Sequence, residues 1–350
     1  MKSDEFQSAL DYLQGLTIFG IKLGLERFTA LCERLGNPQE KFKSIHVAGT
    51  NGKGSTTAMI SSILRCAGYK VGTYYSPYVY DVRERVQVAG QMISKEAFTR
   101  LVNVIRPHVD ALAETELGHP TEFEIKTALG FLYFAEQNVD FAVLEVGMGG
   151  RLDATNVVKP LVSVITNVTL DHIAHLGTTV SEIAGEKAGI IKEGVPLVTA
   201  AADPDALAVI RRICEERGSE MRHVHPEDGA GDTFAVTPVR PGDEMPLPPP
   251  VIIHSGIISV RGMRGQYSDL KLRLQGGFQF INAATAIGAI EVLEDRGFKI
   301  GESAVREGLE SAYLPGRLEV LRRDPILLID GAHNPDGAEQ VASALSNHFK

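Results

Sequence analysis

Cysteine and long apolar runs are both scarce in this sequence. The three cysteines are far apart and lack the spacing of metal ligands, which favours buried, reduced thiols over a catalytic or zinc-binding role: Cys32, Cys66 and Cys214. The first residues contain no apolar stretch of a secretory signal, and no segment offers ~18 uninterrupted apolar residues. These absences argue against export and membrane insertion, and we expect a cytoplasmic protein.

An excess of positive charge is also missing. The 35 basic side chains are outnumbered by 44 acidic ones, giving a formal net charge of −9, which argues against non-specific binding of nucleic acids or membrane surfaces. An anionic ligand must therefore be held by a local group of residues. The 350 residues, 44% of them hydrophobic, fit a soluble enzyme of two domains, and we expect a monomer.

Apolar runs and amphipathic segments alternate along the first two thirds of the chain. The apolar runs predict strands at residues 45–48, 71–75, 141–146, 161–166 and 195–199. Helical patterns predict helices at residues 55–67, 96–113, 123–137, 180–191 and 204–216. This alternation indicates an α/β fold with a mostly parallel sheet of the P-loop type, flanked by helices. In such sheets the loops that follow the strands carry the chemistry.

The composition changes after residue 225. Residues 225–250 are rich in proline, glycine and acidic side chains, and β-like runs follow at 251–260 and 268–274. This pattern indicates a surface excursion with a small antiparallel sheet. Two more helices are expected, at residues 280–296 and 302–310.

A turn of sequence Tyr-Leu-Pro-Gly at residues 313–316 precedes one more predicted strand, at 326–330. We place a domain boundary at this turn. Residues 1–312 then form a central domain that binds the ligands, and residues 313–350 form the start of a second α/β domain, which we expect to be incomplete.

Residues 45–56 carry the clearest chemical motif, because a short apolar run leads into a glycine-rich turn and then into a helix. Glycines at 49, 52 and 54 let backbone N–H groups approach an anion, and Lys53 supplies a cation beside the helix N-terminus. The loop therefore predicts a nucleotide phosphate site. The usual P-loop pattern is not fully met, since Val47 stands where its first glycine belongs. An ordinary strand-to-helix turn remains the alternative.

Two further segments place polar residues after predicted strands. Glu145 ends a buried strand, and a glycine-rich turn follows it; a carboxylate at this position could bind the Mg²⁺ that bridges nucleotide phosphates. The alternative is a structural pair with Arg151. Asp171 and His172 follow the next strand, and His172 is a candidate metal ligand or an ordinary loop histidine.

The motifs together resemble the folylpolyglutamate synthase family, including its bifunctional dihydrofolate synthase members, within the Mur ligase superfamily. The resemblance covers nearly the whole chain. It is carried by residues 23–27, 49–55, 76–77, 84–85, 121–124, 145–156, 171–172, 186–190, 282–283, 315–317 and 330–335. The most specific of these read Thr-Asn-Gly-Lys-Gly-Ser, Gly-Gly-Arg-Leu-Asp-Ala-Thr-Asn and Glu-Lys-Ala-Gly-Ile.

The resemblance implies an ATP-dependent ligase that adds L-glutamate to a folate or dihydropteroate carboxylate through an acyl phosphate. By similarity, the nucleotide site comprises Thr50, Asn51, Gly52, Lys53, Gly54, Ser55, Asn282, Arg317, Asp330 and His333. The implied Mg²⁺ ligands are Ser76, Glu145 and His172, with Ser55 a weaker candidate from P-loop chemistry. The residues assigned to catalysis are Lys53, Glu145, His172 and Lys187, and the resemblance implies that Lys187 is carbamylated.

The pteroate side of the substrate site is expected in three segments. Residues 76–86 offer aromatic rings and guanidinium groups for a flat ring system and its anionic tail, although a plain surface loop would look the same. The candidates there are Tyr78, Arg83 and Arg85. Six others follow from the resemblance alone: Thr121, Phe123, Glu124, Leu152, Asp153 and Ala154.

This chain departs from the resembled family in three places. Tyr78 and Phe278 stand where the family often has histidine, which concerns selectivity more than chemistry. After residue 335 only one helix is expected, where relatives continue into a complete second domain. The sequence therefore predicts that this chain alone binds Mg-ATP weakly and forms little glutamate amide, with residues 326–350 either mobile or exposing apolar surface around residues 326–329. A non-catalytic nucleotide-binding fragment and a Mur-type ligase for another carboxylate remain alternatives.

Overall fold

Strand β1 (Lys43–Ala48) lies near the middle of the main sheet and leads directly into the glycine-rich loop. It pairs in parallel with β5 (Phe141–Glu145) on one side and with β6 (Val162–Ile165) on the other. β2 (Val71–Tyr74) continues the parallel sheet beyond β5. All five predicted strands in this part of the chain are present, and their apolar character reflects burial on both faces of the sheet.

The computed structural model describes residues 2–20, 22–227, 230–240 and 257–348. Beyond β6 the parallel pairing continues into β7 (Leu197–Thr199) and β8 (Met221–Glu227). Among the described residues, the strand order of this sheet is β11-β10-β9-β8-β7-β6-β1-β5-β2-β3-β4.

Antiparallel strands extend both edges of this sheet. One edge carries β3 (Val86–Val88) and β4 (Gln91–Met92); the other carries β9 (Ala230–Val239), β10 (Ile257–Arg261) and β11 (Gln266–Lys271). β9 is antiparallel to β8, and β10 joins β9 in parallel. The predicted antiparallel strands therefore continue the main sheet instead of forming a sheet of their own. Residues 251–256 of the predicted strand lie outside the described part of the chain.

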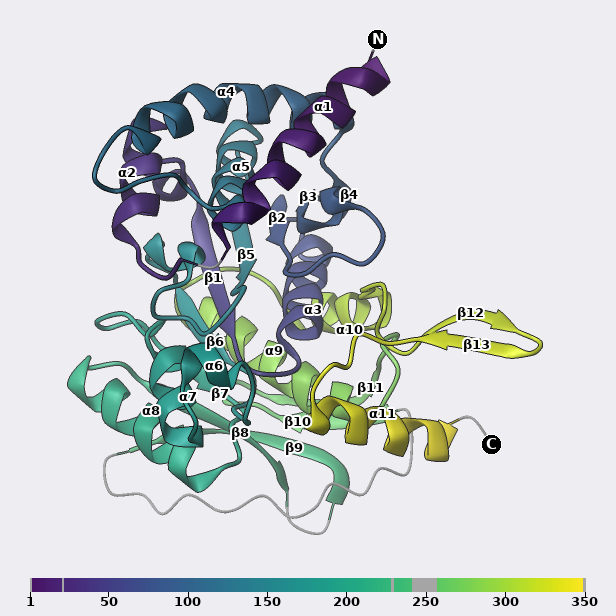
Figure 1. The fold of residues 1–350 in the computed structure, drawn as a ribbon. Coiled ribbons are helices and arrows are strands. Elements are labelled where there is room, and N and C mark those ends of the chain that lie inside the picture. The colour runs from purple at the N-terminus through teal and green to yellow at the C-terminus, as the bar shows by residue number, and fades with distance from the viewer. Residues whose placement is uncertain (1, 21, 228–229, 241–256, 349–350) are drawn as a thin grey trace.

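Helices cover both faces of the sheet (Figure 1). Three pack on one face, around a core of alternate side chains from β1, β5 and β6: α3 (Lys53–Cys66), α9 (Phe278–Asp295) and α10 (Glu302–Ser311). In each of these strands, the side chains that alternate with the ones in this core point to the opposite face of the sheet. There, one end is covered by α1 (Lys2–Gly15), α2 (Glu26–Arg34), α4 (Lys95–Ala113) and α5 (Glu122–Glu136). The other end is covered by α7 (Val180–Ala188) and α8 (Pro204–Glu216).

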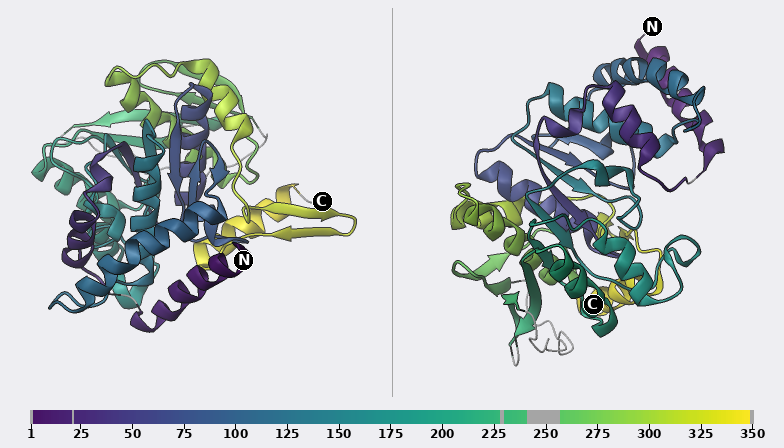
Figure 2. Two further views of the ribbon diagram at one scale, coloured as in Figure 1. Left: turned by 90° about the horizontal axis from the view of Figure 1, so that it is seen from above. Right: turned by 90° about the vertical axis from the view of Figure 1, so that its left-hand side faces the viewer.

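The views in Figure 2 place the N-terminal helices, in purple and blue, at the end of the molecule away from β8 to β11. Short helices complete this part of the fold. α6 (Ile173–Leu176) follows the loop after β6. The part of the chain that the structure describes also contains the single-turn 3₁₀ helices η1 (Leu16–Phe19), η2 (Pro38–Glu40), η3 (Val82–Arg85) and η4 (Ala154–Val157). Among the described residues, none of the helices is both long and apolar enough to cross a membrane.

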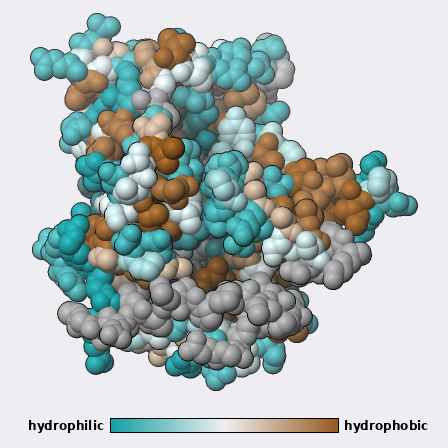
Figure 3. Space-filling view, turned by 60° about the horizontal axis from the view of Figure 1, so that its bottom comes forward, coloured by the Kyte–Doolittle hydropathy of each residue, from teal (hydrophilic) through white to brown (hydrophobic). Residues whose placement is uncertain are grey.

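The C-terminal segment forms a separate two-stranded sheet and one helix: β12 (Glu319–Arg323), β13 (Ile326–Ile329) and α11 (Pro335–His348). The β12–β13 hairpin projects from the body of the protein, and apolar side chains gather over it in Figure 3. Ile326 is 57% exposed and Leu327 46%, which confirms the expected apolar surface. The turn at 313–316 lies between α10 and β12, and the domain boundary there stays a prediction.

Candidate active site

The glycine-rich loop connects β1 to α3 in a conformation that requires glycine. Gly49 and Gly52 have φ values of 147° and 84°, and a Cβ atom on Gly52 would lie 2.3 Å from the Asn282 amide oxygen. The close approach of α9 to the loop therefore depends on the missing side chain. Helix α3 begins at Lys53, so its N-terminal amides face the same space as the loop.

Lys53 is held against this loop. Its Nζ donates hydrogen bonds to the carbonyl oxygens of Gly49 at 3.0 Å and of Thr50 at 2.8 Å. Burial lowers the pKa of Lys53, while the nearby carboxylate of Glu145 acts in the opposite direction. A cation with backbone oxygens as its close partners is free to turn toward a phosphate without breaking an ion pair.

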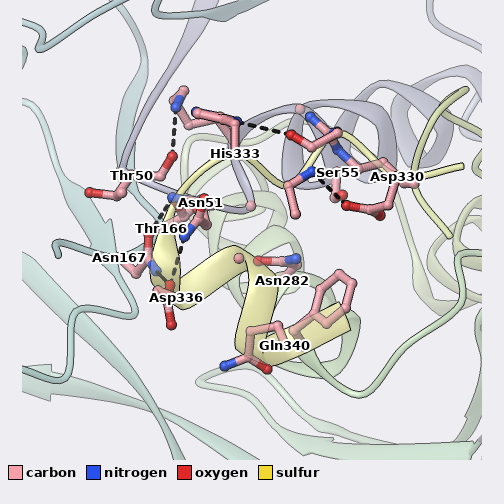
Figure 4. A pocket seen from close by; sticks show the side chains of 18 of the residues that line it. Thr50, Asn51, Ser55, Thr166, Asn167, Asn282, Asp330, His333, Asp336 and Gln340 are labelled. Atoms are coloured by element: carbon pink, nitrogen blue, oxygen red, sulfur yellow. Dashed lines mark hydrogen bonds between the residues drawn. The ribbon is translucent and has the colours of Figure 1, made fainter. Parts of the chain in front are cut away.

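A cavity opens above the loop, and it brings together the predicted nucleotide residues (Figure 4). Its lining includes Thr50, Asn51, Gly52, Lys53, Gly54, Ser55, Ser76, Glu145, Asn282, Arg317, Asp330 and His333. We call this the phosphate-loop cavity. Residues from the loop after β1, the end of β5, helix α9 and the segment before α11 thus meet in one place, although Thr50 and His333 are 283 positions apart in the sequence.

Sequence reasoning missed several polar residues of this cavity, including Asn167, Asp336 and Gln340. The Asn51 backbone N–H donates to the Asn167 side-chain oxygen at 2.7 Å, and the Asn51 amide group donates to the Asp336 carboxylate at 2.6 Å. These bonds tie the phosphate loop to the loop after β6 and to the start of α11. A signal was present, because Asp336 follows the His-Asn-Pro motif directly and Gln340 lies one helical turn later.

Glu145 lies at the carboxyl end of β5 and is buried. Its Oε2 accepts a hydrogen bond from the Ser76 backbone N–H at 2.9 Å. Burial raises the pKa of Glu145 to about 6, against the opposing effect of Lys53. The Ser76 hydroxyl in turn accepts a hydrogen bond from Arg85 at 3.1 Å. The alternative partner for Glu145, Arg151, is instead paired with Glu186 at 2.7 Å.

His172 lies outside the phosphate-loop cavity and lines a second one. Its side chain is 45% exposed, and its backbone N–H donates to the Asp171 carboxylate at 2.9 Å. Ser76 lines both cavities. The three predicted metal ligands are therefore divided: Glu145 faces the first cavity, His172 the second, and Ser76 lies where the two meet.

The second cavity brings together the residues assigned to the pteroate by resemblance. It is lined by Thr121, Phe123, Glu124, Leu152, Asp153 and Ala154, with Ser76 and His172. We call it the pteroate cavity. Sequence reasoning missed its remaining wall, formed by Gly20, Lys22, Leu23, Gly24, Gly147 and Met148. The motif at residues 23–27 was a signal for part of that wall.

Glu124 is buried in the wall of the pteroate cavity, and its two carboxylate oxygens differ in their hydrogen bonds. Oε2 accepts hydrogen bonds from Arg27 Nε at 2.9 Å and from the backbone N–H and hydroxyl of Thr121 at 2.6 and 2.9 Å. Oε1 is buried and has no hydrogen-bond partner among the described residues. A buried carboxylate oxygen without a donor is costly, so this atom is suited to accept a hydrogen bond from a ligand.

Asp153 has a structural role in the same wall. One of its oxygens accepts the backbone N–H groups of Gly147 and Met148, both at 3.0 Å. The other accepts the N–H and hydroxyl of Thr155. Its carboxylate therefore fixes the glycine-rich turn after β5.

The loop after β2 places its three candidates differently. Tyr78 is 41% exposed and lies between two cations, with Arg85 and Lys126 each 5.6 Å from its ring centre. Arg83 pairs with Asp81 at 2.7 Å, and none of the three candidates is among the residues that line either cavity. Arg85 reaches the junction of the cavities through its hydrogen bond to the Ser76 hydroxyl, and the ring of Tyr78 lies beside Arg85.

Lys187, on α7, is only 2% exposed. Its Nζ donates a hydrogen bond to the Gly49 carbonyl at 2.8 Å. Burial, with a contribution from Lys53, lowers the pKa of Lys187 to about 7. Lys187 is therefore a buried lysine that reaches the phosphate loop from helix α7.

The fold and the loop define a Mur-type ligase: residues 47–290 match the family model of the Mur ligase middle domain. A curated relative, the dihydrofolate synthase/folylpolyglutamate synthase of Bacillus subtilis (strain 168), is 46% identical over 346 residues, which cover 98% of this chain and 77% of the relative. The chain therefore belongs to the dihydrofolate synthase/folylpolyglutamate synthase family.

Solved structures of this family have the same fold. A complex of folylpolyglutamate synthase with AMPPCP and folate matches with a TM-score of 0.84 and 34% identity, covering 99% of this chain and 81% of that one. The Mycobacterium tuberculosis folylpolyglutamate synthase complexed with ADP matches with a TM-score of 0.84 and 31% identity, covering 99% of this chain and 74% of that one. These similarities confirm the α/β fold and the resemblance inferred from the motifs.

Proposed function

We propose that this protein uses ATP to join L-glutamate to the carboxylate of dihydropteroate or a folate. The observation that carries the proposal is that Ser76 lines both the phosphate-loop cavity and the pteroate cavity. A phosphate donor and a carboxylate acceptor bound in these cavities would meet at one place. The relatives that were solved with AMPPCP, ADP and folate support the same ligand classes.

The nucleotide would bind with its phosphates at the loop. The amides at the start of α3 and the Lys53 cation would hold the phosphate oxygens, and the loop's glycines would allow close approach. Asn282 on one side, and Arg317 and Asp330 on the other, would enclose the rest of the nucleotide, since all three line the same cavity.

The residues around Ser76 fit a magnesium ion. Glu145 provides a carboxylate that is buried and close to Lys53, and Ser76 adds a hydroxyl beside it; hard oxygen ligands of this kind are those that Mg²⁺ prefers. His172 would complete the protein's ligands from the pteroate side. When bound, Mg²⁺ neutralises charge on the transferred phosphoryl group.

The pteroate cavity would hold a flat heterocycle against Phe123 and Leu152. The free Oε1 of Glu124 would accept hydrogen bonds from ring N–H groups, because a pterin carries an amino group next to a ring nitrogen. Arg27 and Thr121 fix this carboxylate from behind through its other oxygen. The anionic end of the substrate would then extend past Ser76 toward Arg85.

In the reaction, a carboxylate oxygen attacks the γ-phosphorus of ATP, and ADP leaves. The amino group of glutamate then attacks the acyl carbon, its excess proton is lost, and phosphate departs with one of the former carboxylate oxygens. The protein has to position and neutralise charged groups, and no side-chain nucleophile is required. Water has to be kept away from the acyl phosphate until the amine attacks.

Lys187 would carry a carbamate. Its neutral amine adds to CO₂ and loses a proton, which replaces a buried cation by an anion near Lys53. Two lysines that both bond to Gly49 repel each other, and the modification turns that repulsion into attraction. The lowered pKa of Lys187 supports this assignment, because only the unprotonated amine reacts.

Incorporation of labelled glutamate tests the proposed function. Two forms of the protein are compared: the chain alone, and the chain joined to the segment by which the Bacillus subtilis relative is longer. Each form is incubated with ATP, Mg²⁺, labelled glutamate and either dihydropteroate or a reduced folate. We expect a glutamyl product that requires ATP, with little of it formed by the chain alone. A product with a different carboxylate only would support another Mur-type ligase, and ATP binding without any amide in either form would support a non-catalytic nucleotide-binding module.

A further inference from the structure

Three metal-binding side chains from two distant segments converge beside the pteroate cavity. Asp171 and His172 come from the loop between β6 and α6, and His333 comes from the segment before α11. One ligand atom from each of the three lies within 4.8 Å of the others. The two imidazole rings are 6.4 Å apart between centres. This group differs from the proposed magnesium ligands, because it contains neither Glu145 nor Ser76.

The hydrogen bonds around these groups leave ligand atoms available. His333 Nδ1 lies 2.9 Å from the Gly331 carbonyl. Because a carbonyl only accepts, Nδ1 carries the hydrogen, and Nε2 keeps its lone pair for a metal. This is the arrangement in which metal-binding histidines are usually held. Asp171 uses Oδ1 to accept the His172 backbone N–H, and its Oδ2 lies 3.7 Å from His172 Nε2.

Two imidazoles and one carboxylate suit a different class of metal from Mg²⁺. Zn²⁺ and Co²⁺ bind such sets readily, often with one position left for water, whereas Mg²⁺ prefers oxygen ligands alone. Bonds of about 2.1 Å in tetrahedral geometry place ligand atoms roughly 3.4 Å apart. The most distant of the three ligand atoms would therefore have to approach one another by up to about 1.4 Å. His172 and His333 are both exposed, so their side chains can make this movement.

We propose that Asp171, His172 and His333 form an inhibitory site for Zn²⁺ and similar transition-metal ions. A metal ion bound there joins the loop after β6 to the segment before α11. It also takes His172 from the proposed magnesium site and His333 from the phosphate-loop cavity. Its binding does not depend on the ligase activity, whereas its inhibitory effect rests on the proposed function.

Cobalt is the probe for this site, because Co²⁺ takes the same ligands and its visible absorption reports coordination by imidazole. The unmodified chain is titrated with Co²⁺ without nucleotide, and Zn²⁺ is then added to displace it. We expect saturable binding of one ion, and at least about tenfold weaker binding in Asp171→Asn and in His333→Gln. His175→Gln is the matched control, since His175 is an exposed histidine in the same segment, and it should bind like the unmodified chain.

Glu145→Gln separates this site from the proposed magnesium site. It should leave the Co²⁺ affinity unchanged, and circular dichroism should show that each variant is folded. Unchanged affinity in folded His333→Gln, or lost affinity in Glu145→Gln, would overturn the proposal. In the glutamate-incorporation assay, Zn²⁺ should inhibit at concentrations that saturate the Co²⁺-binding site. Saturation of the site without inhibition would refute the inhibitory role and leave the proposed ligase activity intact.

Discussion

Lys53 and Lys187 donate hydrogen bonds to the same atom, the carbonyl oxygen of Gly49, at 3.0 and 2.8 Å. The first lysine belongs to the phosphate loop and the second to α7, so two elements far apart in sequence bring two amines to one point. A phosphate needs the first as a cation. If Lys187 is neutral or carbamylated, the electrostatic repulsion between the two amines, and so the cost of placing them together, is lower.

Carbamylation of Lys187 should follow the protonation of its amine. The pKa of Lys187 is lowered to about 7, so the amine is mainly neutral above that pH and mainly protonated below it. With ¹³C-labelled bicarbonate, a carbamate resonance should appear above pH 7 and disappear as the pH falls through about 7. Lys187→Arg should lack the resonance, and Lys192→Arg should keep it. If the unmodified chain shows no resonance at pH 8, Lys187 is not carbamylated.

Lys53→Ala should weaken the binding of AMPPCP by roughly tenfold to a hundredfold, because a hydrogen bond to a charged group contributes about 1.5–3 kcal/mol. The melting temperature should change little, since the ammonium bonds only to backbone carbonyls of its own loop. Calorimetric titration measures the affinity, and Lys159→Ala, which alters an exposed lysine, is the control. Equal affinities in the two variants would remove Lys53 from the phosphate site.

Glu124→Gln should weaken dihydropteroate binding by roughly tenfold or more and leave AMPPCP binding unchanged. The glutamine oxygen can still accept hydrogen bonds from Arg27 and Thr121, and the new NH₂ group then lies where Oε1 lies in the unmodified chain. This NH₂ group is a donor and would face the N–H donors of the pterin, so the hydrogen bond to the ligand is lost. Fluorescence or calorimetric titration with each ligand separates the two effects. Glu136→Gln, at the other end of α5, is the control. If the affinities for dihydropteroate and AMPPCP fell together, the substitution would have disturbed the fold as a whole.

Gly52→Ala should destabilise the protein by about 1–3 kcal/mol and abolish nucleotide binding. A side chain there would have to adopt a left-handed backbone conformation, and its Cβ would lie 2.3 Å from the Asn282 side chain. Gly185→Ala is the matched control, because it lies in helix α7 with no atom within 4 Å of the added Cβ; it should be neutral or stabilising by up to ~1 kcal/mol. Urea unfolding and AMPPCP titration measure both effects. Normal nucleotide binding by Gly52→Ala would show that the close contact with α9 is dispensable.

Much of the fold could be predicted from the sequence, because buried parallel strands and amphipathic helices have clear periodicities. Helix α8 has its predicted bounds, and α4 and α5 begin one residue before theirs. α1 and β12 were not predicted. β9 was also missed, because its residues lie in a stretch whose composition resembles a loop, and its strand character depends on pairing with β8.

The candidate site was predictable where a motif marks a loop, and less so where the contact is long-range. The glycines and Lys53 predict a phosphate loop without any tertiary information. The Asn51–Asp336 bond joins residues 285 positions apart, and sequence spacing gives no signal for it. Arg83 matched the chemistry expected for an anionic substrate, but Asp81, two residues away, already pairs with it.

The most direct test of the account follows one oxygen atom through the reaction. Dihydropteroate labelled with ¹⁸O in its carboxylate is incubated with ATP, Mg²⁺ and L-glutamate, using whichever form of the protein gives the most glutamyl product. The account predicts one ¹⁸O atom in the inorganic phosphate for each amide formed, because the acyl phosphate loses a former carboxylate oxygen to phosphate. Amide formation with unlabelled phosphate would contradict it.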